Sequence, residues 1–157
     1  MDFRSDTTTL VVHFAATMAA AIITAAGWAH LLALPNKIDM SRDDYLVAQQ
    51  IYRGWALLGI VEFAALALSI YLSWMHRGSG APFVLAVIAV ASITLGLVNF
   101  FGFTYPANRA THEWTMLPDN WQVLRTQWEY SHAAGAILNV IALGSLVLAA
   151  LLARTAR

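Results

Sequence analysis

The sequence predicts an all-α fold: an integral membrane four-helix up-down bundle with helical extensions beyond the bilayer on one side. Composition is the first reason, because 59% of the 157 residues are hydrophobic and only 11% are charged, whereas soluble domains carry about 25% charged residues. The mean hydropathy is +0.61. The second reason is that a helix needs about 20 apolar residues to span a bilayer, and four segments qualify, roughly 8–34, 52–74, 82–103 and 132–153. Because few residues remain outside these spans, we expect a single domain over 1–157.

The first span follows an N-terminal segment without the basic start and the small-residue cleavage site of a removable signal peptide, so we predict a retained helix. Pro35 and the polar residues after it predict a connection that extends to Asp44. Ser41 in this connection is of the residue type that caps helices. It predicts a helical extension that leads into the second span.

A glycine-rich turn at 77–80 joins the second span to the third, which Tyr105-Pro106 ends. Asp119 or Asn120 can cap a helix that begins outside the membrane and continues without a breaker into the fourth span. Four spans place both termini and the short turn on one side of the membrane, which we call side A. The two longer connections and the helical extensions lie on the opposite side, side B.

The charged residues bear on partners and on orientation. Nine Lys and Arg residues balance nine Asp and Glu residues, so no basic field exists that would attract nucleic acid. The absence of Cys excludes disulfides, iron–sulfur clusters and thiolate haem ligands. The positive-inside rule counts Lys and Arg near the span ends, and the two sides carry nearly equal numbers of these residues. Once Arg53 and Arg125, which we place within helices, are left out of the count, side A carries the larger number. We therefore predict that both termini lie in the cytoplasm.

Each span carries its polar and small residues on one helical face, because residues three or four apart point the same way. The aligned sets are, in chain order, His13, Thr17, Thr24 and Gly27; Tyr52, Trp55, Gly59, Glu62 and Ser69; Ser92, Gly96, Asn99 and Phe103; and Trp121, Arg125, Trp128, His132 and Asn139. Lipid solvates neither carboxylates nor imidazoles, so these faces are predicted to point into the bundle. Glu62 is the clearest case, since an acidic residue at the centre of a span costs about 2.5 to 3.5 kcal/mol.

Depth along the spans indicates which polar residues meet. Counted from side B, a shallow layer holds His30, Tyr52, Arg53, Asn99, Glu129 and His132, and a deeper layer holds Thr24, Glu62 and Asn139. We predict a polar pocket on side B with Glu62 near its floor. Structural roles compete with this hypothesis: the tryptophans near side B also suit an aromatic belt, the small residues suit helix packing, and Arg125 with Glu129 suits a helix-stabilising pair.

Metal and haem sites are alternatives built from the same residues. Glu129-x-x-His132 has the spacing of a di-iron ligand pair, but a di-iron bundle needs this motif twice and two further Glu residues. The chain has only Glu62, Glu113 and Glu129, so we do not predict a di-iron site. Two alternatives stay open: a mononuclear iron site of His30, His132 and Glu129, and a b-type haem held by His30 and His132. The leading hypothesis requires no cofactor.

The stretch 108–139 reads NRATHEWTMLPDNWQVLRTQWEYSHAAGAILN and contains the arrangement Trp-x3-Arg-x2-Trp-Glu-x2-His. Together with the four-span layout, it resembles an integral membrane family of unknown function that includes the fungal anthrone oxygenases. The resemblance covers nearly the whole chain. It implies a four-helix membrane fold and an oxygenase activity, and the positions that it marks are Asn108, Trp121, Arg125, Trp128, Glu129 and His132.

The resemblance also implies a mechanism, because an anthrone carries an acidic methylene between aromatic rings. An enzyme has only to remove a proton, stabilise the enolate and admit oxygen. His132, oriented by Glu129, would be the general base. Arg125 or His30 would stabilise the oxyanion.

We therefore predict a membrane oxidoreductase, similar to an anthrone oxygenase, that acts on a hydrophobic aromatic or quinone-like molecule. Its catalytic residues would be His132, Glu129 and Arg125, and its substrate would contact His30, Tyr52, Glu62, Asn99, Asn108, Trp121, Trp128 and Asn139. The alternative is a non-enzymatic membrane subunit or a protein that binds a lipid or small molecule. Assembly as a homo-oligomer or in a membrane complex stays open. A transporter is disfavoured because the chain shows no inverted repeat.

Overall fold

The computed structural model describes residues 3–155, and the side chains of residues 7–153. Its helices are α1 (Phe3–Lys37), α2 (Arg42–Gln49), α3 (Leu58–Met75), α4 (Ala81–Asn99), α5 (Tyr105–Ala110) and α6 (Trp121–Thr155). Short 3-10 turns at Gln50–Tyr52 and Trp55–Leu57 precede α3, and a π-helical turn at Phe100–Thr104 joins α4 to α5. No strand occurs within the described range.

Four helical stretches of the described chain are long and apolar enough to cross a membrane: Thr7–Lys37, Trp55–Met75, Ala81–Ala110 and Trp121–Ala153. Large apolar side chains on their outer faces are exposed, among them Leu32, Ile60 and Val98. A surface of this kind requires a cover of lipid or of another protein. The prediction of an all-helical chain with four long apolar helices is confirmed.

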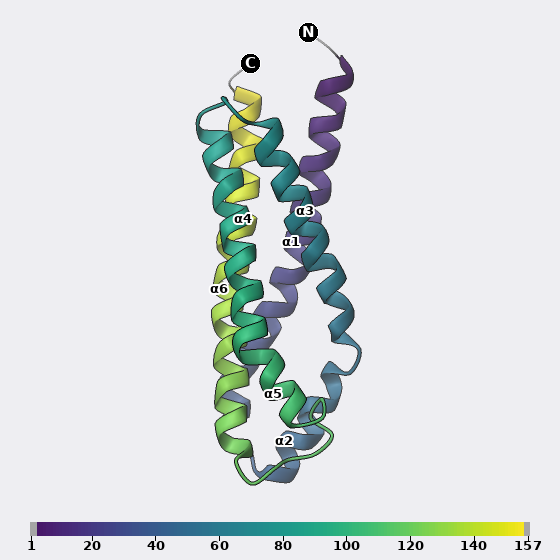
Figure 1. The fold of residues 1–157 in the computed structure, drawn as a ribbon, viewed down its shortest axis with the longest axis vertical. Coiled ribbons are helices and arrows are strands. Elements are labelled where there is room, and N and C mark those ends of the chain that lie inside the picture. The colour runs from purple at the N-terminus through teal and green to yellow at the C-terminus, as the bar shows by residue number, and fades with distance from the viewer. Residues whose placement is uncertain (1–2, 156–157) are drawn as a thin grey trace.

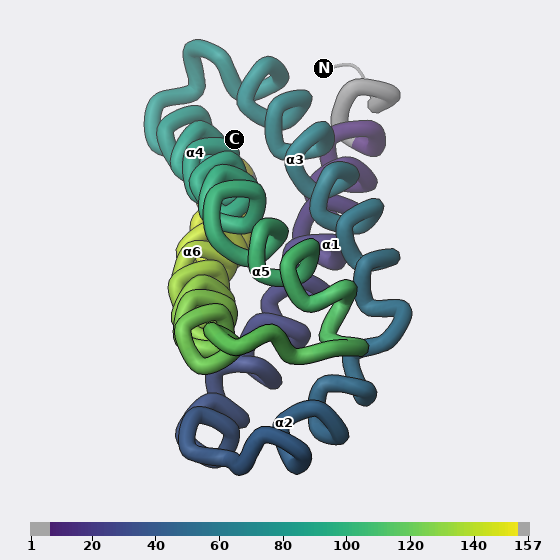
Figure 2. Tube along the Cα trace, turned by 60° about the horizontal axis from the view of Figure 1, so that its bottom comes forward, coloured from purple at the N-terminus to yellow at the C-terminus, as the bar shows by residue number. Residues whose placement is uncertain are grey.

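Figure 1 shows the four long helices side by side, with both ends of the described chain at the same end of the bundle, at the top of the view. The turn between α3 and α4 lies at this end too, so this end corresponds to side A. The opposite end, side B, holds α2, α5 and the loop that leads into α6 (Figure 1). Figure 2 brings side B forward and shows α2 and this loop across the end of the bundle.

Both predicted proline boundaries differ from the structure. α1 continues through Pro35 to Lys37, because a proline in the last turn removes only one helical hydrogen bond. The third span also passes beyond Phe103 and through Tyr105-Pro106 into α5. The π-helical turn puts this proline in the first turn of a new helical segment, where its missing N–H has no helical partner to lose.

The helical extension that was predicted after Ser41 is α2. Ser41 Oγ accepts a hydrogen bond from the Asp44 N–H at 3.3 Å, as expected of a helix cap. α2 does not run directly into the second span, however. Gly54 has a φ of 88°, which glycine adopts without strain, and it separates the two 3-10 turns that precede α3.

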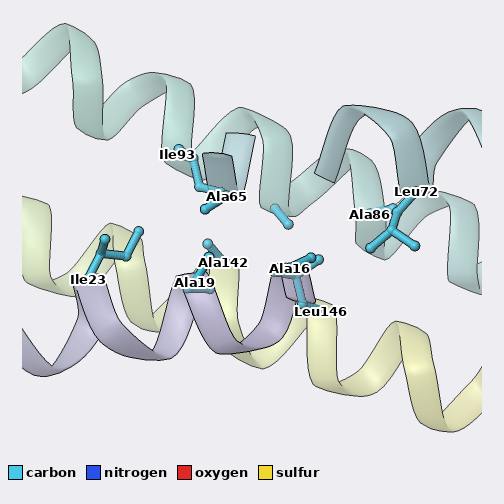
Figure 3. Close-up of a cluster of buried hydrophobic side chains, with 11 residues drawn as sticks. Ala16, Ala19, Ile23, Ala65, Leu72, Ala86, Ile93, Ala142 and Leu146 are labelled. Carbon is cyan, nitrogen blue, oxygen red and sulfur yellow. The ribbon is translucent and has the colours of Figure 1, made fainter. Parts of the chain in front are cut away.

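Small side chains pack the middle and the side A part of the bundle. Figure 3 shows this core, in which alanines of all four long helices meet Ile23, Leu72, Ile93 and Leu146. Alanine lets helix backbones approach closely, which favours helix association in lipid. Toward side B, a Cβ added at Gly27 would lie 3.1 Å from the Cα of Ala136, so α1 and α6 remain in close contact. α3 and α4 separate instead (Figure 1).

A second buried cluster covers the side B end. It joins α2, α5, the loop before α6 and the first turns of α6 through Tyr45, Ala107, Trp114, Leu117, Trp121, Leu124 and Trp128. Trp28, Trp114 and Trp121 are among the tryptophans that suited an aromatic belt. Trp114 and Trp121 are therefore buried, whereas Trp28 is 43% exposed on the outer face of α1.

Candidate functional site

A cavity of about 660 Å³ lies among α1, α3, α4 and α6 in the side B half of the bundle. Small-molecule sites have volumes of about 300–1,000 Å³, with a few polar groups in a mostly apolar wall. Eight of the residues predicted for the site line this cavity: His30, Tyr52, Glu62, Asn99, Asn108, Trp128, His132 and Asn139. Arg125, Glu129 and Trp121, which were also predicted for the site, are not in its lining.

Glycines create the space. One glycine from each long helix lines the cavity, namely Gly27, Gly59, Gly96 and Gly135. A Cβ added at Gly59 would meet no atom within 4 Å, and one added at Gly135 would lie 3.9 Å from Asn99 Nδ2. At Gly96 an added Cβ would lie 3.5 Å from Glu62 Oε1, so the glycine makes room for the carboxyl group.

His30 lies at the centre of a group of rings. Its ring centroid is 4.2 Å from that of His132, 4.3 Å from Tyr52 and 5.0 Å from Trp128. Trp55 meets it edge-on at 5.4 Å. All of these rings line the cavity. Flat aromatic surfaces favour a flat aromatic ligand, because offset-stacked and edge-to-face ring pairs are both favourable.

The hydrogen bond of His132 fixes its tautomer. Its Nδ1 lies 2.9 Å from the carbonyl oxygen of Trp128, one turn earlier in α6. A carbonyl oxygen only accepts, so Nδ1 carries the proton and donates it. A neutral His132 then keeps its lone pair on Nε2, which suits a general base or a hydrogen-bond acceptor for a ligand. The Trp128 carbonyl, rather than Glu129, therefore orients this imidazole.

His30 and the deep residues offer polar groups that the protein leaves unpaired. His30 is 6% exposed, and its Nδ1 is buried without a hydrogen-bond partner among the described residues. Asn139 Oδ1 is buried and unpaired as well. Within the described side chains, Glu62 has neither a hydrogen bond nor an ion pair. Asn99 differs, because its Nδ2 donates to the Ser131 carbonyl at 2.7 Å. A buried polar group without a partner is costly, and the Glu62 carboxyl, which lines the cavity, favours a polar ligand or water there.

Glu129 lies behind the cavity wall in a buried ion pair. Lys37 Nζ is 2.8 Å from Glu129 Oε1, and the two side chains are only 4% and 0% exposed. The Lys37 ammonium also lies 4.6 Å from the ring centroid of Tyr52 and 4.9 Å from that of Trp128, which are cation–π contacts. Because both rings line the cavity, the ion pair supports the wall from the side away from the ligand.

Tyr45 of α2 forms a hydrogen bond with the carboxylate of this ion pair. Its hydroxyl donates to Glu129 Oε1 at 3.0 Å and accepts a hydrogen bond from the Gln49 amide. Burial, followed by the nearby Glu129 carboxylate, raises the pKa of the Tyr45 hydroxyl above its ordinary value. The hydroxyl therefore remains a protonated donor throughout the physiological range.

Arg125 and Trp121 hold the side B end together. Arg125 Nη1 donates to the Met40 carbonyl at 2.8 Å, and the guanidinium lies 4.6 Å from the Trp121 ring centroid. These contacts tie α6 to the connection before α2. The predicted role of Arg125 beside a substrate oxyanion does not fit this position, and His30 is the remaining candidate for that role.

Asn108 fixes two tryptophans. Its Oδ1 accepts hydrogen bonds from Nε1 of Trp114 at 3.0 Å and from Nε1 of Trp128 at 2.8 Å. All three residues line the cavity. The position that the family resemblance marks is therefore one that sets the orientation of the indole rings in the cavity wall.

The loop before α6 contains a strained segment. His112, Glu113 and Trp114 have φ values of 49°, 56° and 59°, in the left-handed region that costs about 1–2 kcal/mol for each residue with a side chain. Hydrogen bonds hold the segment, including Glu113 N–H to the Asn108 carbonyl at 2.8 Å and Gln50 Nε2 to the Trp114 carbonyl at 3.1 Å.

Several residues that shape the site were absent from the predictions. The sequence predicts Lys37 to lie in a polar connection, and it indicates no site role for Tyr45, Gln49 and Trp114. A signal for Lys37 existed, because it lies two helical turns after His30 and therefore on the same helical face. This shared face of His30 and Lys37 follows from the sequence only if the helix is predicted to continue through Pro35. No local pattern links α2 to Glu129.

The metal alternatives do not fit this geometry. Among the described residues, no three His, Cys, Asp or Glu side chains lie close enough together to hold a metal ion. Glu129 is paired with Lys37, so it is not available beside His30 and His132. The centroids of these two imidazoles are 4.2 Å apart, which leaves no room for a haem between them.

No family model, curated protein or solved structure matches this chain. The resemblance to the anthrone oxygenase family therefore stays a prediction.

Proposed function

We propose that this protein is an integral membrane oxidoreductase that binds a flat, hydrophobic aromatic or quinone-like molecule in the cavity and oxidises it with molecular oxygen. The observation that carries the proposal is the fixed tautomer of His132, which leaves Nε2 as the basic nitrogen of a residue in the cavity wall. Imidazole is the commonest general base. The class of reaction comes from the resemblance to the anthrone oxygenases.

In the proposed reaction, His132 removes one proton from a methylene group that is conjugated, through aromatic rings, with a ketone. The electron pair of the broken C–H bond delocalises onto the ketone as an enolate, and His30 donates an N–H to the enolate oxygen. O2 adds to the methylene carbon and takes up the proton, which gives a hydroperoxide. Loss of water then gives a second carbonyl. One oxygen atom of O2 ends in this carbonyl and the other in water, so oxidation of the carbon balances reduction of O2.

A second candidate function uses the same cavity without chemistry. Glu62 lines the cavity and has neither a hydrogen bond nor an ion pair within the described side chains, so it favours a ligand with a complementary polar group, and binding alone would satisfy it. The protein would then be a membrane binding protein for a lipid or an aromatic small molecule. Measurement of binding and of turnover on the same sample separates the two functions.

Filling the cavity at Gly59 should weaken the function. We expect Gly59→Leu to keep the fold, because no atom lies within 4 Å of the new Cβ, and to weaken the binding of anthrone by at least about tenfold, or 1.4 kcal/mol. Quenching of tryptophan fluorescence by anthrone in detergent micelles measures binding. Formation of anthraquinone, with O2 consumption above the rate of spontaneous oxidation, measures turnover.

Gly144→Leu is the matched control, because Gly144 is an exposed glycine of α6 outside the cavity and a Cβ there also meets no atom within 4 Å. It should behave as the unsubstituted protein does. If Gly59→Leu binds and oxidises anthrone normally, the cavity is not the site. If the unsubstituted protein binds anthrone without oxidising it, the second candidate function replaces the first.

We also propose that the four spans cross the bilayer up and down in turn, with both termini in the cytoplasm. Both ends of the described chain lie at the same end of the bundle, which supports this topology (Figure 1). We expect tags at the two termini to be cleaved by protease in inside-out vesicles and protected in right-side-out vesicles. Opposite accessibility of the two tags would exclude four spans, and the reverse pattern for both would invert the orientation.

A further inference from the structure

Two aromatic residues belong both to the cavity wall and to the outer surface of the bundle. Phe63 of α3 is 53% exposed and Phe101 of the π-helical turn is 52% exposed, yet both line the cavity. Tyr105, one helical turn after Phe101, lines it too and is 41% exposed. Side chains that contact the cavity and the exterior at once mark an opening, and this opening lies between α3 and the π-helical turn.

The surface around this opening is apolar. Phe63 lies in the apolar stretch Trp55–Met75, and Phe101 lies in Ala81–Ala110. Their exposed neighbours on the same helices include Ile60, which is 70% exposed, and Val98, which is 63% exposed. Acyl chains rather than water cover a surface of this kind in a bilayer. The opening therefore faces the lipid.

The backbone explains why the opening exists. α3 and α4 lie together near side A and separate toward side B (Figures 1 and 2). The left-handed Gly54 interrupts the chain before α3, and α4 ends in a π-helical turn, a feature that is frequent at functional sites. Among the described residues, the ring contacts of Phe101 are with Phe100 and Tyr105, and none joins it to Phe63.

The polar end of the cavity is bridged in part, although Arg53, Glu113 and Thr115 line the cavity there and are exposed. Gln50, before α3, donates to the Trp114 carbonyl in the loop before α6 at 3.1 Å. The Trp114 side chain is 3% exposed and packs edge-on against Tyr45 and Trp128, at 5.2 and 5.8 Å between centroids. These contacts connect the two segments that border the cavity on side B, where the chain faces water.

We infer that the cavity has a lateral portal, bounded by Phe63 and Phe101, through which its ligand arrives from the lipid phase of the membrane. The ligand class is a hydrophobic molecule that partitions into acyl chains and carries a polar group that reaches Glu62 and Asn139. The chemistry performed on this ligand rests on the proposed function, whereas the portal does not.

A label inside the cavity tests the portal without any substrate. The sequence has no Cys, so Gly59→Cys gives one reactive thiol in the cavity wall, where a bimane label can be attached. The full chain is reconstituted in phosphatidylcholine vesicles with brominated or unmodified acyl chains. Bromine on the chains quenches bimane from the lipid, and iodide in the buffer quenches it from water. Ile60→Cys provides the lipid-facing reference and Asp43→Cys, at an exposed residue of α2, the water-facing reference.

We expect brominated lipid to quench the label at position 59 clearly, but several-fold less than the label at position 60. Phe63→Ala in the Gly59→Cys chain should increase this quenching several-fold, because the portal widens. Ile70→Ala, at an exposed apolar residue of α3 outside the cavity lining, should not change it. The portal is disproved if brominated lipid does not quench the label at position 59, or if Phe63→Ala leaves the quenching unchanged. Either result leaves anthrone binding and turnover to be judged separately.

Discussion

His132→Gln should lower the rate of anthrone oxidation by about 10²–10⁴-fold, the usual contribution of a general base. Glutamine keeps a polar side chain that extends about as far as the imidazole does, but it has no basic nitrogen. We therefore expect turnover to fall while the affinity for anthrone changes little. Initial rates of O2 consumption at saturating anthrone measure the first quantity, and fluorescence quenching measures the second.

The matched control for this substitution is His76→Gln at the other end of the bundle. His76 is buried, its Nε2 lies 2.7 Å from Nε2 of His13, and it does not line the cavity. Its replacement should leave turnover unchanged. A His132→Gln protein with full activity would show that another group removes the proton, and a parallel loss of thermal stability would indicate a structural role for the imidazole.

Lys37→Met should destabilise the protein by about 3–5 kcal/mol, because it leaves the Glu129 carboxylate buried without its cation. Lys37 and Glu129 are 2.8 Å apart and nearly inaccessible to solvent, so neither charge can be rehydrated without opening the joint between α1 and α6. Reversible unfolding in mixed micelles with increasing denaturing detergent measures the loss. The fall should be accompanied by weaker anthrone binding, since Tyr52 and Trp128 lose the ammonium behind them.

A second substitution distinguishes the effect of the unpaired Glu129 carboxylate from the effect of the lost Lys37 packing. Lys37→Met with Glu129→Gln should recover most of the stability, because no buried charge remains. Arg109→Met, at an exposed cation of α5, should change stability by no more than about 0.5 kcal/mol. If Lys37→Met is as stable as the unsubstituted protein, or the double variant is no better than Lys37→Met alone, the ion pair has no structural role.

Hydrophobicity made the long helices predictable, because a membrane span must form all of its backbone hydrogen bonds within itself, as a helix does, and because its apolar residues are contiguous in the chain. The cap at Ser41 was predictable for a similar reason, since the bond to Asp44 is local. Proline was a poor guide to helix ends here, because Pro35 lies in a last turn and Pro106 lies after a π-helical turn. The left-handed segment at 112–114 contains no glycine, so no residue type indicated its backbone.

The site was predictable where helical periodicity sufficed. The polar face of each span identified Glu62, Asn99 and His132, all of which line the cavity. Periodicity does not determine which residue of another helix meets a given side chain. The family resemblance pairs Glu129 with His132 on the same helix, whereas the partners of Glu129 in the structure, Lys37 and Tyr45, come from α1 and α2.

The buried ion pair also affects the chemical reactivity of the protein. Lys37 is the only lysine in the sequence, and its ammonium is held against Glu129 and two aromatic rings. An acylating reagent requires a free, deprotonated amine, so it can modify this side chain only while α1 and α6 are apart. The rate of acylation at Lys37, followed by mass spectrometry of the peptide that contains this residue, therefore measures how often this contact between α1 and α6 opens, and it does so without an introduced reporter group.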